Sequence, residues 1–157
     1  MLTDAISSSL GRAGFAVAPV EIGDSGGVVA TRSEFRWRWF ATRLHTFVYV
    51  LRFDGTREDA VRLGEASLAH ALAHKRGLPR GIQTGVVSVP VLVAELAQDD
   101  ARTWASTLHA KFAAFLFPVV VETNARRVSY QRKRTALARV YQPFLQRLVA
   151  DHIEANA

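Results

Sequence analysis

The sequence predicts an α+β fold, in which helices pack on a mixed, mainly antiparallel sheet in the order α-βββ-α-β-α-ββ-α. Two neighbouring stretches within residues 28–53 alternate apolar and polar side chains, as antiparallel strands with one buried face do. Valine-rich runs at 85–93 and 115–122 then alternate with helical patterns, which indicates buried strands. The 157 residues contain no internal repeat and no long linker, so we expect a single domain over residues 1–157.

The N-terminal third is expected to form a helix and then a three-stranded meander. A helix over 4–13 would end at Gly14, and a strand over 15–22 follows it. Residues 23–27 (Gly-Asp-Ser-Gly-Gly) are the clearest turn signal in the chain. The two alternating strands come next, and their shared face would be aromatic and largely buried. We expect that face to carry Phe35, Trp37, Trp39, Phe47, Tyr49 and Leu51.

A long helix is predicted after the meander. Thr56 and Asp59 resemble a capping box, and the helix that they open would run to about Arg76, with Gly77 as its stop. The predicted apolar stripe of this helix consists of Val61, Gly64, Leu68, Ala71 and Leu72.

The second half of the chain is predicted to alternate between strand and helix. A helix from Asp99 to about Phe112 precedes the strand at 115–122, and a short strand at 128–132 follows a turn. The chain then forms a helix from about Thr135. Pro143 would either kink that helix or start another one.

The composition excludes several kinds of site. Because there is no cysteine, the chain has no disulfide, thiolate zinc site, iron–sulfur cluster or catalytic thiol. The longest uncharged stretch, residues 81–94, is too short to span a bilayer, and the chain does not open like a secretory signal. We therefore expect a cytoplasmic protein that is soluble, does not contact a membrane and uses no cofactor.

Two histidines have the spacing of paired metal ligands on a helix. His70 and His74 lie four residues apart, but Ala71 stands where a zincin motif would place a glutamate. No third ligand is evident from the spacing. We therefore favour solvated histidines that point away from the apolar stripe, and we expect no metal site.

The formal charge of +6 is concentrated at the C-terminal end. Residues 123–157 hold seven basic and two acidic side chains, and none is acidic from Thr123 to Ala150. Such a segment is expected to bind a polyanion or an acidic protein surface, or to pair with carboxylates elsewhere in the fold. Its candidate binding residues are Arg126, Arg127, Arg132, Lys133, Arg134 and Arg139.

A second candidate anion site is the glycine-containing basic loop at residues 75–81. A helix stop explains its first residues but leaves Arg80 and Gly81 unexplained. The loop matches neither the Walker A nor the dinucleotide-binding pattern. Its candidate anion-binding residues are Lys75, Arg76, Arg80 and Gly81.

Two functions follow from these sites. The first is a non-catalytic binding module whose basic C-terminal surface meets an anionic or acidic partner, such as nucleic acid or an acidic protein. The alternative is a small enzyme acting on an anionic small molecule held at the 75–81 loop. That enzyme would require Arg80, His109 and Glu122 to converge in a pocket. Because seven of the 15 aromatic residues lie within 35–53, we also expect a homo-oligomer.

Overall fold

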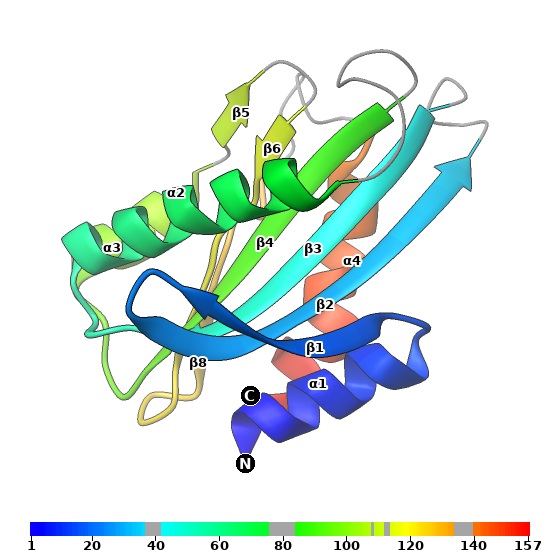
Figure 1. The fold of residues 1–157 in the computed structure, drawn as a ribbon. Coiled ribbons are helices and arrows are strands. Elements are labelled where there is room, and N and C mark those ends of the chain that lie inside the picture. The colour runs from blue at the N-terminus through cyan, green and yellow to red at the C-terminus, as the bar shows by residue number, and fades with distance from the viewer. Residues whose placement is uncertain (37–41, 76–83, 108, 112–113, 134–139) are drawn as a thin grey trace.

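The computed structural model describes residues 1–36, 42–75, 84–107, 109–111, 114–133 and 140–157. Figure 1 shows a twisted sheet with helices on both faces. The strands run β1-β2-β3-β4-β6-β5, while β7 pairs with a later part of β4 and β8 with β7. Parallel pairing joins β4 to β3, β6 and β7, and all other pairs are antiparallel. The predicted α+β fold with a mixed sheet is therefore confirmed.

The first three strands form the predicted antiparallel meander, β1 (Ala16–Ile22), β2 (Ser25–Arg36) and β3 (Thr42–Arg52). The turn between β1 and β2 is shorter than residues 23–27, because only Gly23 and Asp24 lie between the two strands. Gly23 has a φ of 62°, as the first central residue of a type II′ turn does. Gly27 lies inside β2, where a Cβ would come within 2.2 Å of the carbonyl oxygen of Val50. This close approach requires glycine.

The helix α2 (Arg57–His74) connects β3 to the parallel strand β4 (Thr84–Ala94). Thr56 is its N-cap, as predicted, and its Oγ1 accepts a hydrogen bond from the backbone N–H of Asp59 at 3.2 Å. The Asp59 carboxylate accepts from the N–H of Asp54 at 3.0 Å, whereas in a standard capping box it would accept from the N–H of the N-cap residue, Thr56. The cap therefore fixes the first residue of α2 and the path of the chain that leads into it from β3.

The buried stripe of α2 differs from the predicted one. Val61, Leu68 and Leu72 are only partly buried, so the stripe is rotated by about one residue. Gly64 and Ala71 are buried as predicted, whereas the large side chains of the predicted stripe are not, because small residues let α2 lie close to its neighbours. Gly64 is an example, because a Cβ there would come within 2.5 Å of the Trp104 ring. The buried residues of α2 are Ala60, Leu63, Gly64, Ser67 and Ala71.

The segment after β4 departs most from the prediction. Helix α3 (Asp99–Ala105) has seven residues and does not continue to Phe112. It ends where the hydroxyls of Ser106 and Thr107 donate to backbone carbonyls of the helix, and β5 (His109–Lys111) begins soon afterwards.

The predicted strand at 115–122 is two short strands. Strand β6 (Ala114–Leu116) and strand β7 (Val119–Glu122) pair with successive parts of β4. Residues 117 and 118 interrupt them, and Pro118 has no N–H to donate to a sheet ladder. Strand β8 (Arg127–Ser129) follows a turn and pairs with β7.

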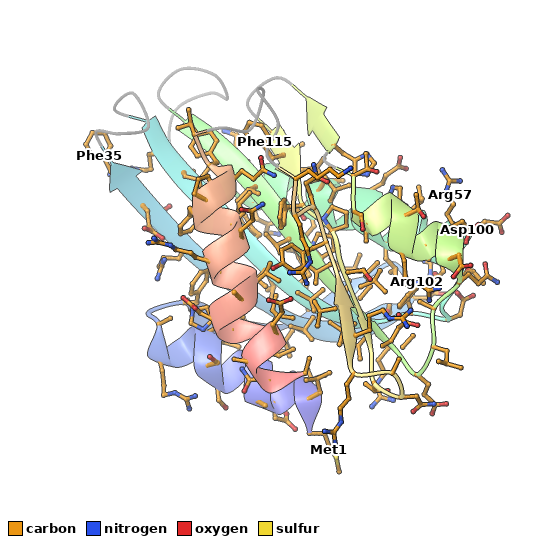
Figure 2. The ribbon with its side chains drawn as sticks, turned by 180° about the vertical axis from the view of Figure 1, so that it is seen from behind. Met1, Phe35, Arg57, Asp100, Arg102 and Phe115 are labelled. Carbon is orange, nitrogen blue, oxygen red and sulfur yellow. The ribbon has the colours of Figure 1, made fainter. Side chains whose placement is uncertain are left out.

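Two helices, α1 (Leu2–Arg12) and α4 (Gln142–His152), cover the face opposite α2 and α3, as Figure 2 shows from behind. Gly14 follows α1 with a φ of 90°, as predicted for a helix stop. Pro143 lies in the first turn of α4, so it starts a helix there. The predicted helix start near Thr135 lies outside the described residues, and a short 3₁₀ helix (Glu154–Asn156) ends the chain.

The predicted aromatic face is correct only where α2 covers it. Phe47, Tyr49 and Leu51 are buried against that helix, but Phe35, on the same face near the end of β2, remains 47% exposed. Trp37 and Trp39 lie outside the described residues. Within the described ranges, no helix is both long enough and apolar enough to cross a membrane.

Candidate functional site

A groove of about 470 Å³ lies between α3 and the chain from β8 to Lys133, and we call it the basic groove. None of its described lining residues carries a carboxylate. The hydroxyls of Thr103, Ser106 and Thr107 donate to carbonyls of their own helix, so toward the groove they present acceptors. The groove's donors are therefore chiefly its cations, Arg127, Arg132 and Lys133.

Two of the cations predicted to bind a partner have carboxylates nearby. A guanidinium nitrogen of Arg127 lies 3.7 Å from Oε2 of Glu122. Arg132 stacks on the ring of Tyr130 at 4.3 Å, and its Nη2 lies 2.5 Å from Oε1 of Glu154. Burial, followed by the Glu154 charge, raises the pKa of Tyr130. Arg132 is thus held in place by an aromatic ring and a carboxylate.

The other two described cations have no such partner. Within the described part of the chain, neither Arg126 nor Lys133 makes an ion pair, and both are exposed. Arg126 adopts a φ of 46° in the turn before β8. Arg134 and Arg139 lie outside the described residues. The predicted cations therefore divide into two with counter-charges and two without.

Glu122 lies behind the basic groove and positions its wall. Its side chain is 2% exposed, and Oε1 accepts from Nη1 of Arg102 at 2.9 Å and from the N–H of Ala97 at 3.1 Å. Arg102, labelled in Figure 2, also pairs with Asp99 at the start of α3. Through Arg102, the Glu122 carboxylate connects that helix to the end of β7. Glu122 therefore has a structural role. The absence of acidic residues from Thr123 to Ala150, on which the prediction of a basic surface rested, could not indicate it.

The residues required by the enzyme hypothesis do not all meet. Glu122 pairs with Ala94, at the end of β4. His109 pairs with Leu116 of β6, and Leu116 pairs with Ser88 of β4. At the rise per residue of a β-strand, Ser88 lies about 20 Å before Ala94 along β4. Glu122 and His109 therefore lie in different places, while Arg80 lies outside the described residues.

Of the predicted anion-binding loop, only Lys75 falls within the described residues. It is the C-cap of α2, and its N–H donates to the carbonyl of Ala71 at 3.0 Å. Its charge contributes to lowering the pKa of His45, so it lies near a histidine of β3. Arg76, Arg80 and Gly81 lie outside the described residues.

A second groove, of about 520 Å³, was not anticipated from the sequence. It lies over the β1–β3 face where α2 ends, and because three imidazoles line it we call it the histidine groove. His70 does not point only to solvent as predicted. It is partly buried, its Nδ1 lies 2.9 Å from Oη of Tyr49, and its ring stacks on that of His74 with centroids 3.9 Å apart. The described residues contain no group of three or more histidine, aspartate or glutamate side chains that could hold a metal ion.

The sequence carries one weak signal for this groove, the alternation within residues 28–53. Ser33 and His45 lie directly opposite each other in β2 and β3. The register between these two strands decides which residues face each other. Alternation within each strand does not fix that register, so the pairing was not predicted.

No protein-family model matches the chain, and no curated protein or solved structure matches it. The geometry of the two grooves is therefore the basis for a functional proposal.

Proposed function

We propose that the protein is a non-catalytic binding module that holds a phosphate-bearing polymer along the basic groove. The supporting observation concerns Lys133, which lines a groove whose described lining lacks carboxylates, and Arg126, which precedes the lining residue Arg127 in the chain. Neither makes an ion pair within the described residues. Cations left facing solvent in this way attract polyanions, and phosphate contacts provide most of the affinity of non-specific nucleic-acid binding.

The composition of the groove favours binding without sequence preference. Its aromatic side chain, Tyr130, is buried and is covered by the Arg132 guanidinium. The described lining therefore offers no exposed ring on which a base could stack. Contacts through charge alone position a nucleic-acid backbone but do not read its sequence.

The test removes the two cations that lack ion-pair partners. In the double variant Arg126→Asn and Lys133→Gln, asparagine tolerates the positive φ of residue 126. The matched control, Arg12→Gln with Arg57→Gln, removes the same charge from α1 and α2, outside the groove. Mixed-sequence duplex DNA, RNA and heparin are titrated from about 50 mM salt upward.

We expect the groove variant, and not the control, to weaken binding to duplex DNA and to flatten its salt dependence. Each lost phosphate contact should reduce the slope of log K against log salt by about 0.9. Equal effects of the two variants would attribute binding to net charge alone. If none of the three polymers binds, the polyanion proposal is wrong, and an acidic protein surface becomes the partner to test.

Arg132→Ala provides a separate measurement. Because Arg132 pairs with Glu154 and stacks on Tyr130, this variant is expected to lower the free energy of unfolding as well as affinity. A variant that loses affinity with unchanged stability would instead identify Arg132 as chiefly a ligand contact.

We also propose that the chain forms a homo-oligomer in the cytoplasm. Phe35 is 47% exposed, and it lies near the end of β2, beyond the residues that pair with β1. Light scattering at micromolar concentration should give at least twice the chain mass of 17.3 kDa. The variant Phe35→Ser should shift the mass toward the monomer if this surface is the interface. A monomer in the wild type contradicts the proposal, and cell fractionation tests the location.

A further inference from the structure

The histidine groove contains a polar group that the described residues leave unsatisfied. His45 is 7% exposed, and its Nδ1 lies 2.6 Å from Oγ of Ser33. Its Nε2 is shielded from solvent and has no hydrogen-bond partner in the described part of the chain. Buried polar groups almost always have a partner, because leaving one without costs stability. Because His45 lines the groove, a ligand atom that reaches the edge of its ring would supply that partner.

The charges around His45 favour an anion as that ligand. The pKa of His45 is lowered by burial and then by the cations of Arg43 and Lys75. None of the described residues that line the groove carries a carboxylate. An anion beside Nε2 would accept a hydrogen bond from the ring N–H and would favour the imidazolium form of His45.

The remaining groups that face the groove do not replace His45 in this role. Arg32 already donates to the carbonyl of Ala13 and pairs with Glu34. On α2, His70 is bonded to Tyr49. His74 is exposed, and its Nδ1 lies 2.8 Å from the carbonyl oxygen of His70.

Apart from Thr31, the rest of the described lining is apolar. Val29 and Phe47 belong to the hydrophobic cluster beneath α2, and Ala16 and Ala18 of β1 extend the apolar surface. A cavity of about 520 Å³ lies within the size range of small-molecule sites, which combine apolar walls with a few polar groups. A purely inorganic anion would leave these walls unused.

We propose that the histidine groove binds a small organic carboxylate, with its carboxylate on Nε2 of His45 and its apolar body against Val29 and Phe47. This site is distinct from the basic groove, which involves other strands and permanent charges. Binding does not require a chemical step.

The proposal predicts that binding is linked to proton uptake. A carboxylate beside the ring favours the imidazolium, so the pKa of His45 is higher in the complex than in the free protein. Affinity is therefore greatest below the free pKa and falls as the pH rises toward the bound pKa. Because burial, Arg43 and Lys75 hold the free value below 6.5, the decline begins below pH 6.5.

Three probes separate the parts of the proposal. Benzoate has both a carboxylate and an apolar body, benzamide lacks the charge, and acetate lacks the body. Binding is followed by NMR at pH 5.5 and pH 8, from the shift of the His45 ring proton and, in every variant, from the shift of the backbone amide of Val29 in the groove. We expect benzoate to bind at least fivefold more tightly at the lower pH. Benzamide should bind more weakly and without pH dependence, and acetate should bind more weakly than benzoate at both values.

Two variants identify the titrating group. His45→Gln keeps a hydrogen-bonding side chain but cannot titrate, so benzoate affinity at pH 5.5 should fall at least fivefold to the level seen at pH 8. The matched control is His152→Gln, because His152 forms a similar pair with Ser9, at 2.8 Å, between α1 and α4 and away from the groove. His74→Gln tests the exposed imidazole of the groove and should leave the pH dependence unchanged.

The wild-type measurements alone can overturn the proposal, even if His45→Gln fails to fold. Equal affinity for benzoate and benzamide, or no saturable shift of the His45 ring up to about 50 mM benzoate, contradicts it. Loss of the pH dependence in His74→Gln would indicate that His74, and not His45, contacts the anion. That result would also contradict the proposal. The Arg126→Asn, Lys133→Gln variant should bind benzoate normally, so failure of the polymer proposal does not decide this one.

Discussion

The two grooves present positive charge in different ways. The basic groove carries guanidinium and ammonium groups that remain charged at any physiological pH, and the carboxylates of Glu122 and Glu154 pair with two of them. The histidine groove carries imidazoles, and burial lowers the pKa of His45 and His70. Salt concentration is therefore expected to govern binding in the basic groove, and pH is expected to govern binding in the histidine groove. A chain with a net charge of +6 thus has two electrostatic surfaces that can be separated experimentally.

The largest expected effect comes from Glu122→Gln, which removes the charge behind the basic groove. Arg102 and the N–H of Ala97 would lose a charged acceptor that is 2% exposed. Removing one partner of a fully buried ion pair costs about 3–5 kcal/mol, and since Arg102 is partly exposed we expect about 2–3 kcal/mol. Urea denaturation measures this loss.

The same substitution should strengthen polyanion binding, because Arg127 loses its nearby carboxylate. Glu95→Gln is the control, since Glu95 is exposed and makes no ion pair within the described ranges. Equal unfolding free energies for the two variants would show that the contacts of Glu122 do not stabilise the fold. Benzoate binding in the histidine groove should not change.

The second expected effect is a fall in stability at acid pH that originates in histidines. The pKa values of His45, His70 and His152 are all lowered by burial in the folded protein, whereas the unfolded chain has the usual value of 6.5. The unfolded state therefore binds more protons below pH 6.5. The histidine contribution to stability is complete above pH 6.5 and is lost as the pH falls toward the folded pKa values.

His45→Gln should reduce the difference between the urea midpoints measured at pH 5 and pH 8. Arg126→Asn, in the chain segment of the basic groove, should leave that difference unchanged. A wild-type midpoint that is higher at pH 5 than at pH 8 would contradict the assignment.

The smallest expected effects come from one tyrosine in each groove region. Tyr49→Phe removes the contact with His70, and Tyr130→Phe removes the hydrogen bonds with Glu154 and Arg132. Each should lower the free energy of unfolding by about 1 kcal/mol. Because only the second involves charged partners, its cost should shrink in 1 M salt while that of Tyr49→Phe stays constant. Equal salt responses would remove the electrostatic distinction between the two regions.

The features that the sequence predicted depend on local patterns. The alternation within residues 28–53, the Thr56 cap and the stop at Gly14 are visible in a few neighbouring residues, and the structure confirms them. The end of α3 was missed because residues 106–112 have adequate helix propensity, whereas the structure places His109–Lys111 in β5, beside β6. Tertiary pairing overrode the local preference there.

The two grooves show the same limit for function. A run of cations without acids is visible in the sequence, and so Arg127 and Arg132 were candidates. Their partners Glu122 and Glu154 belong to other elements, so the pairing could not be predicted. The contact between His45 and Ser33 depends on strand register over 12 residues, and no motif records such a distance.

The parallel pairing of β3 with β4 has a consequence for folding kinetics. Residues 53–83 must bridge these two central strands before their ladder can close, whereas β1, β2 and β3 are joined by short connections. Closing a long segment costs chain entropy before the new contacts compensate for it, and domains rich in such non-local pairs fold slowly. The meander can therefore pair early, and its β3 edge stays open until α2 has formed and β4 arrives. During that interval the apolar edge of β3 is the part of the chain most exposed to aggregation.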